Sequence, residues 1–161
     1  MAEIEAKLKK MGLELPAPLK APPGLKLPFK PVIVRGKHVY ISGHAPQNPD
    51  GSIAGPMGKV GKELSLEQGY QAAKLVGLSI LGDLKREIGD LDRVAAWLRV
   101  LGMVNVAPGF NQTTPVINGF SDLIVELYGP ERGAHTRSAV GMAALPLDIS
   151  VEIEAEVELA G

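Results

Sequence analysis

The sequence predicts an α+β domain in which two long helices cover one face of a mostly antiparallel sheet. Several short segments show the period-two alternation or β-branched content of strands, and two longer ones carry apolar residues at helical spacing. Along the chain these come as two strands, a helix, a strand, a second helix and two strands. With 161 residues the chain is the size of one domain. We take residues 1–161 as that domain, with a proline-rich extension over about residues 1–28.

The N-terminal segment divides into a helix and an extended arm. Residues 3–11 place apolar side chains at helical spacing, and Gly12 ends the predicted helix. Residues 16–31 hold six of the 13 prolines. Proline has no backbone N–H for a sheet ladder, so this part is predicted to run extended over the surface. Residues 31–35 and 38–43 then predict the first pair of strands.

Both long helices carry local start and stop signals. Ser65 and Gln68 form a capping box at the start of the first helix. Its apolar stripe continues to about Ile88, where a glycine follows. Thr114, followed by a proline, predicts the start of the second helix. The Gly-Pro pair at residues 129–130 predicts its end.

The strand between the two helices is predicted over residues 93–104. Its residues alternate in character, and Trp97 and Leu101 fall on the same face. Apolar side chains on both faces indicate a strand that is covered on both sides.

Residues 136–158 predict a hairpin with one buried face. From Ile149 onward, apolar residues alternate with one serine and four glutamates. The Leu-Pro-Leu-Asp sequence at residues 145–148 has the composition of a turn. A four-residue loop would pair Val140 with Ile153 and place Arg137 on the same face as the glutamates. The small residues on that face (Ala139, Gly141, Ala143) would leave room for another subunit or a ligand.

Composition excludes several classes of function. A net charge of −1 and a pI of about 6.3 provide no surplus of cations for nucleic-acid phosphates. Cysteine is absent and the three histidines are scattered, so we expect neither a metal site nor a cofactor. No apolar run reaches the length of a membrane span. The acidic start lacks the apolar core of a signal peptide, so a cytoplasmic location is expected.

The stretch Arg-Ser-Ala-Val-x-x-Ala-x-Leu-Pro-x-Asp-x-x-Val-Glu-Ile-Glu-Ala, residues 137–155, resembles the signature of the Rid family. These reactive intermediate deaminases are also called the YjgF family and are often labelled L-PSP endoribonucleases. Residues 40–46 resemble the family's strand ending in Ser-Gly. The resemblance implies a chorismate-mutase-like fold and a homotrimer, with clefts between subunits that bind small carbonyl or imine acids.

The resemblance also implies roles for individual residues. In deaminating members, the arginine matching Arg137 grips the substrate carboxylate, and the glutamate matching Glu152 positions or activates water. An asparagine matching Asn118 lies near the cleft, although the position of Asn118 in its helix favours a solvent-facing or capping amide. His135 shares the Arg137 face of an extended strand, and a surface or capping role is its alternative.

Three further positions are candidates for substrate binding. Phe29 stands where deaminating members place a tyrosine, so that hydroxyl is lost. Ala139 stands where the family has a cysteine, and Gly43 closes the Ser-Gly strand end.

Three functions remain open at this stage. One is the hydrolysis of 2-imino or enamine acids, and another is a non-catalytic trimer that binds small carboxylates. An endoribonuclease is the least favoured, since the glutamate row opposes a polyanion. In the predicted hairpin Arg137 and Glu152 lie four positions apart, roughly 13 Å. That separation favours a site shared between subunits.

Overall fold

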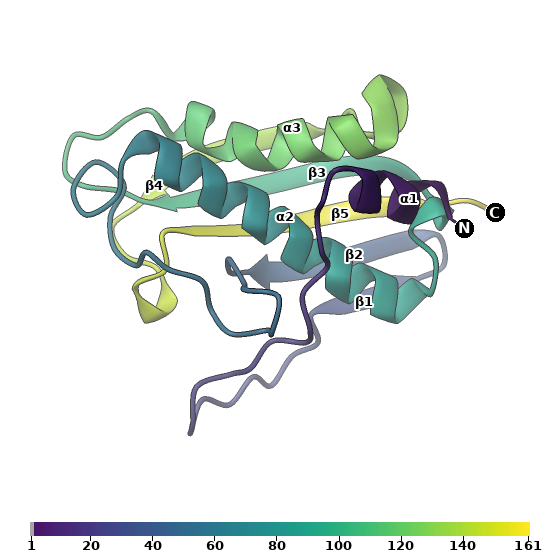
Figure 1. Ribbon diagram of the computed structural model, residues 1–161, viewed down its shortest axis with the longest axis horizontal. Coiled ribbons are helices and arrows are strands. Elements are labelled where there is room, and N and C mark those ends of the chain that lie inside the picture. The colour runs from purple at the N-terminus through teal and green to yellow at the C-terminus, as the bar shows by residue number, and fades with distance from the viewer. Residues whose placement is uncertain (1) are drawn as a thin grey trace.

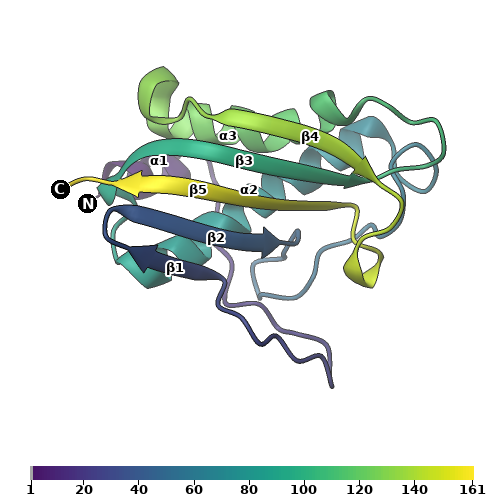
Figure 2. The same cartoon turned by 180° about the vertical axis from the view of Figure 1, so that it is seen from behind.

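A computed structural model describes residues 2–161 and confirms the predicted α+β fold. Five strands form one sheet in the order β1-β2-β5-β3-β4, and only the β3–β4 pair is parallel. The long helices α2 and α3 lie side by side on one face (Figure 1), and the opposite face carries no helix (Figure 2). We call that second surface the open face. The main elements are α1 (Glu3–Lys10), β1 (Val32–Arg35), β2 (His38–His44), α2 (Leu66–Ile88), β3 (Val94–Asn105), α3 (Thr113–Arg132), β4 (Thr136–Met142) and β5 (Val151–Leu159).

The start signals of the long helices predict their positions closely. At α2 the Ser65 hydroxyl accepts from the Gln68 backbone N–H, and the Gln68 side chain accepts from the Ser65 N–H. The helix α3 begins one residue before the predicted cap. It also passes the predicted stop, because Gly129 takes a non-helical conformation and the chain resumes helix to Arg132.

The helix predicted near the N-terminus forms as α1, and it packs against the core of the domain. Ile4 and Leu8 are buried in the main hydrophobic cluster. Asp92 accepts hydrogen bonds from the backbone N–H groups of Glu3 and Ile4. Because a carboxylate there satisfies two free N–H groups at the helix start, the helix is fixed at this position. Only the proline-rich part that follows runs extended.

The predicted hairpin of residues 136–158 does not form. β4 pairs in parallel with β3, and β5 lies between β2 and β3, antiparallel to both. The connection over residues 143–150 carries the chain past the end of β3 to its other edge. β3, α3 and β4 instead form a strand–helix–strand unit, which makes adjacent strands parallel.

This pairing reverses the predicted faces of β4. Val140 lies beside Met103 rather than Ile153, and it is exposed. Arg137 points toward α3, on the side of the sheet away from the glutamates. A Cβ on Gly141 would meet the Val106 side chain at 2.9 Å, so this small residue faces the protein's own chain.

Trp97 is also placed differently from the prediction. The pairing of β3 with β5 shifts twice, between Val94 and Ala96 and between Trp97 and Arg99. Each irregularity turns the following residue to the other face. As a result Trp97 lies in the core between Phe120 and Tyr128, while Leu101 stays on the open face.

Close contact between the two long helices depends on Gly119. A Cβ there would lie 2.0 Å from the Tyr70 carbonyl oxygen of α2. We predict that Gly119→Ala lowers the free energy of unfolding by about 1–3 kcal/mol, because the helices must separate. Urea unfolding should show this loss, whereas Val125→Ala, on the exposed side of α3, should change little. Equal stability of Gly119→Ala and the wild type would contradict it.

Candidate functional site

Arg137 is held at the edge strand β4 by polar groups of α3. Its Nη1 donates to Asn118 Oδ1 and to Ser121 Oγ, each at 2.9 Å. Its Nη2 lies 3.4 Å from the Thr114 carbonyl oxygen. Asn118 and Ser121 are three residues apart on the helix, so both reach the same side of it.

His135 extends this arrangement. Its Nδ1 donates to the Gly133 carbonyl oxygen at 2.7 Å, which leaves Nε2 as an acceptor. The Ser121 hydroxyl can therefore donate to Nε2, at 2.9 Å, while its oxygen accepts from Arg137. Burial lowers the pKa of His135, and the nearby Arg137 charge acts in the same direction, so the neutral ring is favoured. We call Arg137, Asn118, Ser121 and His135 the arginine cluster.

The guanidinium of the arginine cluster has no anionic partner within residues 2–161. All its acceptors are neutral. Burial lowers the pKa of Arg137 and Asp122 opposes that effect, but Asp122 accepts from the Tyr70 hydroxyl and forms no ion pair with Arg137. An arginine remains charged at neutral pH. The cluster therefore presents an uncompensated, partly buried positive charge.

Ala139 lies next to this cluster on the same face of β4. Its carbonyl oxygen accepts from Thr113 Oγ1 at 3.0 Å, and its side chain packs against the hydrophobic core. It contributes shape and no reactive group.

Glu152 lies on the open face, as the alternation of β5 predicted. Its carboxylate lies against Gly43, where a Cβ would come within 2.4 Å of Oε2. Any other residue at position 43 would have to displace it. Burial raises the pKa of Glu152 and the neighbouring Glu154 adds to the rise, while His44 opposes them. A raised pKa makes a carboxylate a stronger base.

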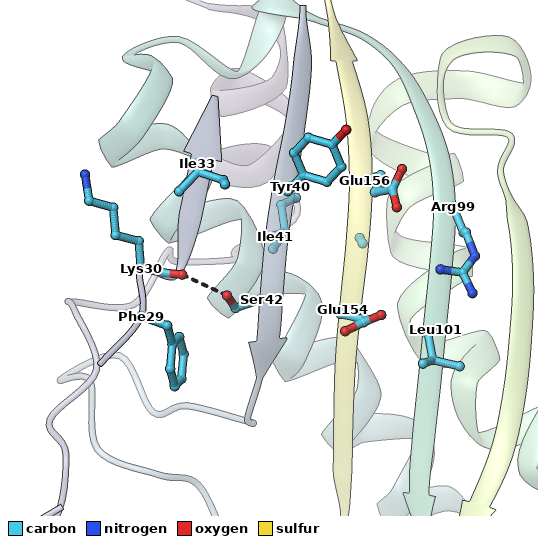
Figure 3. A pocket seen from close by; sticks show the side chains of 11 residues that line it. Phe29, Lys30, Ile33, Tyr40, Ile41, Ser42, Arg99, Leu101, Glu154 and Glu156 are labelled. Carbon is cyan, nitrogen blue, oxygen red and sulfur yellow. Dashed lines mark hydrogen bonds between the residues drawn. The ribbon is translucent and has the colours of Figure 1, made fainter. Parts of the chain in front are cut away.

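The open face also contains a hollow of about 330 Å³ (Figure 3). Phe29 stands at its rim, 56% exposed, and Ser42 and Glu154 lie farther along it. Tyr40 and Arg99 project over the same sheet surface. Phe29 and Glu154 both line the hollow, with Ser42 between them. Glu154 is the next residue after Glu152 on this face of β5.

Arg137 and Glu152 cannot meet within one chain. β4 and β5 are separated by β3, and Arg137 is level with Ala155, three residues along β5 from Glu152. Their backbones are thus roughly 14 Å apart. Their side chains also project from opposite faces of the sheet. A ligand that touches both must lie where two copies of the chain meet.

The structure sorts the predicted site residues into two groups. Asn118, His135 and Ala139 gather around Arg137, whereas Gly43 contacts Glu152 and Phe29 lines the hollow. Sequence reasoning missed Ser121, which links Arg137 to His135. The signal was available, because a polar residue three positions after Asn118 shares its helix face.

Residues 2–161 contain no cluster of histidine, aspartate and glutamate side chains suited to hold a metal ion. In the same residues no helix combines the length and apolar character needed to cross a membrane.

Comparisons with known proteins agree over nearly the full chain. Residues 5–157 match the family described as "YjgF/chorismate_mutase-like, putative endoribonuclease". Protein TCP17 of Trypanosoma cruzi is 35% identical over 156 residues, covering 97% of this chain and 94% of that protein. The structure of Atu1372 from Agrobacterium tumefaciens is 36% identical with a TM-score of 0.86, covering 98% and 94% of the two chains. RidA from a Psychrobacter species shares the fold, at 22% identity and a TM-score of 0.56, covering 88% and 94%.

Proposed function

Because the chain belongs to the YjgF/chorismate mutase-like family, we propose that it binds small 2-keto and 2-imino carboxylates in clefts between the subunits of a homotrimer. We further propose that it hydrolyses the imines to 2-keto acids and ammonia. Arg137 of one subunit would hold the carboxylate, and Glu152 of another would act on water.

The observation that carries this proposal is the uncompensated guanidinium of the arginine cluster. Arg137 is oriented by Asn118 and Ser121, yet no carboxylate within residues 2–161 pairs with it. A guanidinium can hold a carboxylate through two parallel charge-assisted hydrogen bonds. Its position at an edge strand leaves the ligand side open to a neighbouring subunit.

Glu152 supplies the chemistry that imine hydrolysis needs. It takes a proton from water as the oxygen forms a bond to the imine carbon, the C=N electron pair moves to nitrogen, and Glu152 gives that proton to the nitrogen. Glu152 then takes the proton of the new hydroxyl and passes it to the same nitrogen, so that the C–N bond breaks, the carbonyl forms and ammonia leaves. This hydrolysis changes no oxidation state, so it needs no oxidant. Its raised pKa suits a group that must accept and return a proton.

The open face is the surface that a second subunit would cover. Its exposed apolar side chains include Phe29, Tyr40 and Val140. Closed rotational assembly repeats one such contact around an axis. Three identical contacts would bring three arginine clusters to three copies of Glu152.

The test is an ammonia-release assay in which 2-iminobutyrate is generated in situ, with calorimetry of 2-ketobutyrate binding in parallel. We expect hydrolysis to require ionised Glu152. Since burial raises the pKa of Glu152, the rate should fall as pH drops through a value above the ordinary glutamate range. Ketobutyrate binding without ammonia release would support the non-catalytic trimer instead. Absence of both would refute the proposal.

A further inference from the structure

His44 is buried and both of its ring nitrogens are engaged. Only 7% of the residue is exposed. Nδ1 lies 2.6 Å from the Ser42 carbonyl oxygen, and Nε2 lies 3.0 Å from Asp83 Oδ2 in α2. A carbonyl oxygen can only accept a hydrogen bond, so Nδ1 must carry a proton.

Asp83 can also only accept, because it is ionised. The guanidinium of Arg86 favours the ionised form of this carboxylate. Arg86 donates to Asp83 Oδ1 from Nε at 3.0 Å and from Nη2 at 2.6 Å. An ionised carboxylate has no proton to give, so Nε2 must donate as well. With two ring protons His44 is an imidazolium.

Arg86 also connects Asp83 to the N-terminal part of the chain. Arg86 Nη1 donates to the Pro16 carbonyl oxygen at 3.0 Å, which ties α2 to the proline-rich arm.

The imidazolium lies directly behind Glu152. His44 pairs across the sheet with Ile153, the residue that follows Glu152, and Gly43 contacts the Glu152 carboxylate. The charged groups around the ring are Asp83 and Arg86 from α2 and Glu152 from β5, with Glu154 farther along β5. Because Asp83 is shared with Arg86, its single negative charge cannot offset both cations. A net positive charge remains to act on Glu152.

We propose that His44 is a positioning residue, a buried imidazolium clamped by Ser42 and Asp83 whose charge keeps Glu152 ionised and ready to accept a proton from water. This rests on the proposed role of Glu152 in imine hydrolysis. Because His44 is buried, it acts through Glu152 and is not itself the base. Its charge counters Glu154 and burial, which both favour the protonated form of Glu152.

Nitrogen-15 NMR of histidine-labelled protein tests the charge without any activity. At pH 7 both His44 ring nitrogens of the wild type should show the chemical shifts of protonated nitrogens. In Asp83→Asn the imidazolium loses its ionic partner, so one His44 ring nitrogen should lose its proton at the same pH. A wild-type His44 with an unprotonated ring nitrogen at pH 7 would overturn the proposal.

Carbon-13 titration of the Glu152 carboxyl tests the effect on Glu152. His44→Gln should move its titration midpoint to higher pH, since the positive charge is gone. His38→Gln, on the exposed side of the same strand, is the matched control and should not move it. An unchanged midpoint in folded His44→Gln would contradict the proposal, and if that variant fails to fold, the same titration of Asp83→Asn decides.

Kinetics then separate this proposal from the proposed function. If the wild type releases ammonia, the acid limb of the pH–rate profile should move to higher pH in His44→Gln by the same shift as the carboxyl titration. If the wild type releases none, imine hydrolysis fails while the two NMR readouts still decide the charge of His44. An acid limb that stays in place while the carboxyl titration moves would refute the positioning role.

Discussion

Replacing Arg137 by alanine should weaken 2-ketobutyrate binding by roughly 2–5 kcal/mol, about 30-fold or more. The guanidinium is the positive charge of the arginine cluster, and without it the ligand carboxylate would be desolvated with no ionic partner. Arg137→Lys should recover only part of the loss, since an ammonium cannot present two parallel donors. Isothermal titration calorimetry at low and physiological salt measures both variants.

The matched control is Arg35→Ala. Arg35 is exposed at the edge strand β1, and within residues 2–161 its only side-chain hydrogen bond is to the adjacent Val34 carbonyl oxygen. Its removal changes the net charge by the same amount far from the arginine cluster. If Arg137→Ala bound as well as Arg35→Ala, the cluster would not be the carboxylate site.

Replacing Glu152 by glutamine should reduce imine hydrolysis by at least about 100-fold, because an amide cannot accept the proton of water. Binding of 2-ketobutyrate should stay the same or improve slightly. The substitution removes a negative charge that does not help to hold an anion. The two effects together distinguish a base from a residue that only shapes the cleft.

Glu158→Gln is the control for this substitution. Glu158 lies in the same row on the open face of β5, three alternating positions beyond Glu152. It should leave hydrolysis near the wild-type rate. Wild-type hydrolysis in Glu152→Gln would exclude Glu152 as the base and leave the binding role of Arg137 standing.

Local sequence signals predicted the elements whose determinants are local. The capping box of Ser65 and Gln68 places the start of α2, and the strict alternation of β5 places Glu152 on the open face. Neither depends on which segments become neighbours. Both therefore follow from the residues themselves.

Strand pairing depends on partners that local patterns cannot identify. Residues 136–142 and 149–158 are compatible with a hairpin, and nothing in their alternation excludes it. In the structure β3 pairs with β4 along one edge and with β5 along the other. The connection between β4 and β5 therefore crosses the end of β3, and the two strands cannot form a hairpin. The two register shifts that turn Trp97 into the core are equally invisible in a regular alternation.

The candidate site was predicted residue by residue but not as an arrangement. The family resemblance pointed to Arg137 and Asn118, and strand alternation pointed to His135. The structure brings these three together through Ser121. It places Glu152 on the other face of the sheet. Arg137 and Glu152 are separated because β4 pairs in parallel with β3, which turns Arg137 toward α3.

Subunit complementation tests the central claim, that Arg137 of one subunit acts with Glu152 of another. Arg137→Ala and Glu152→Gln proteins, each inactive alone, are mixed, dissociated under mild denaturant and reassembled. In a mixed trimer one of the three clefts joins an intact Arg137 to an intact Glu152. Random mixing should therefore restore about a quarter of the wild-type ammonia release. No recovery in trimers shown by native mass spectrometry to be mixed would contradict the shared site, since it would mean that both residues must come from one chain.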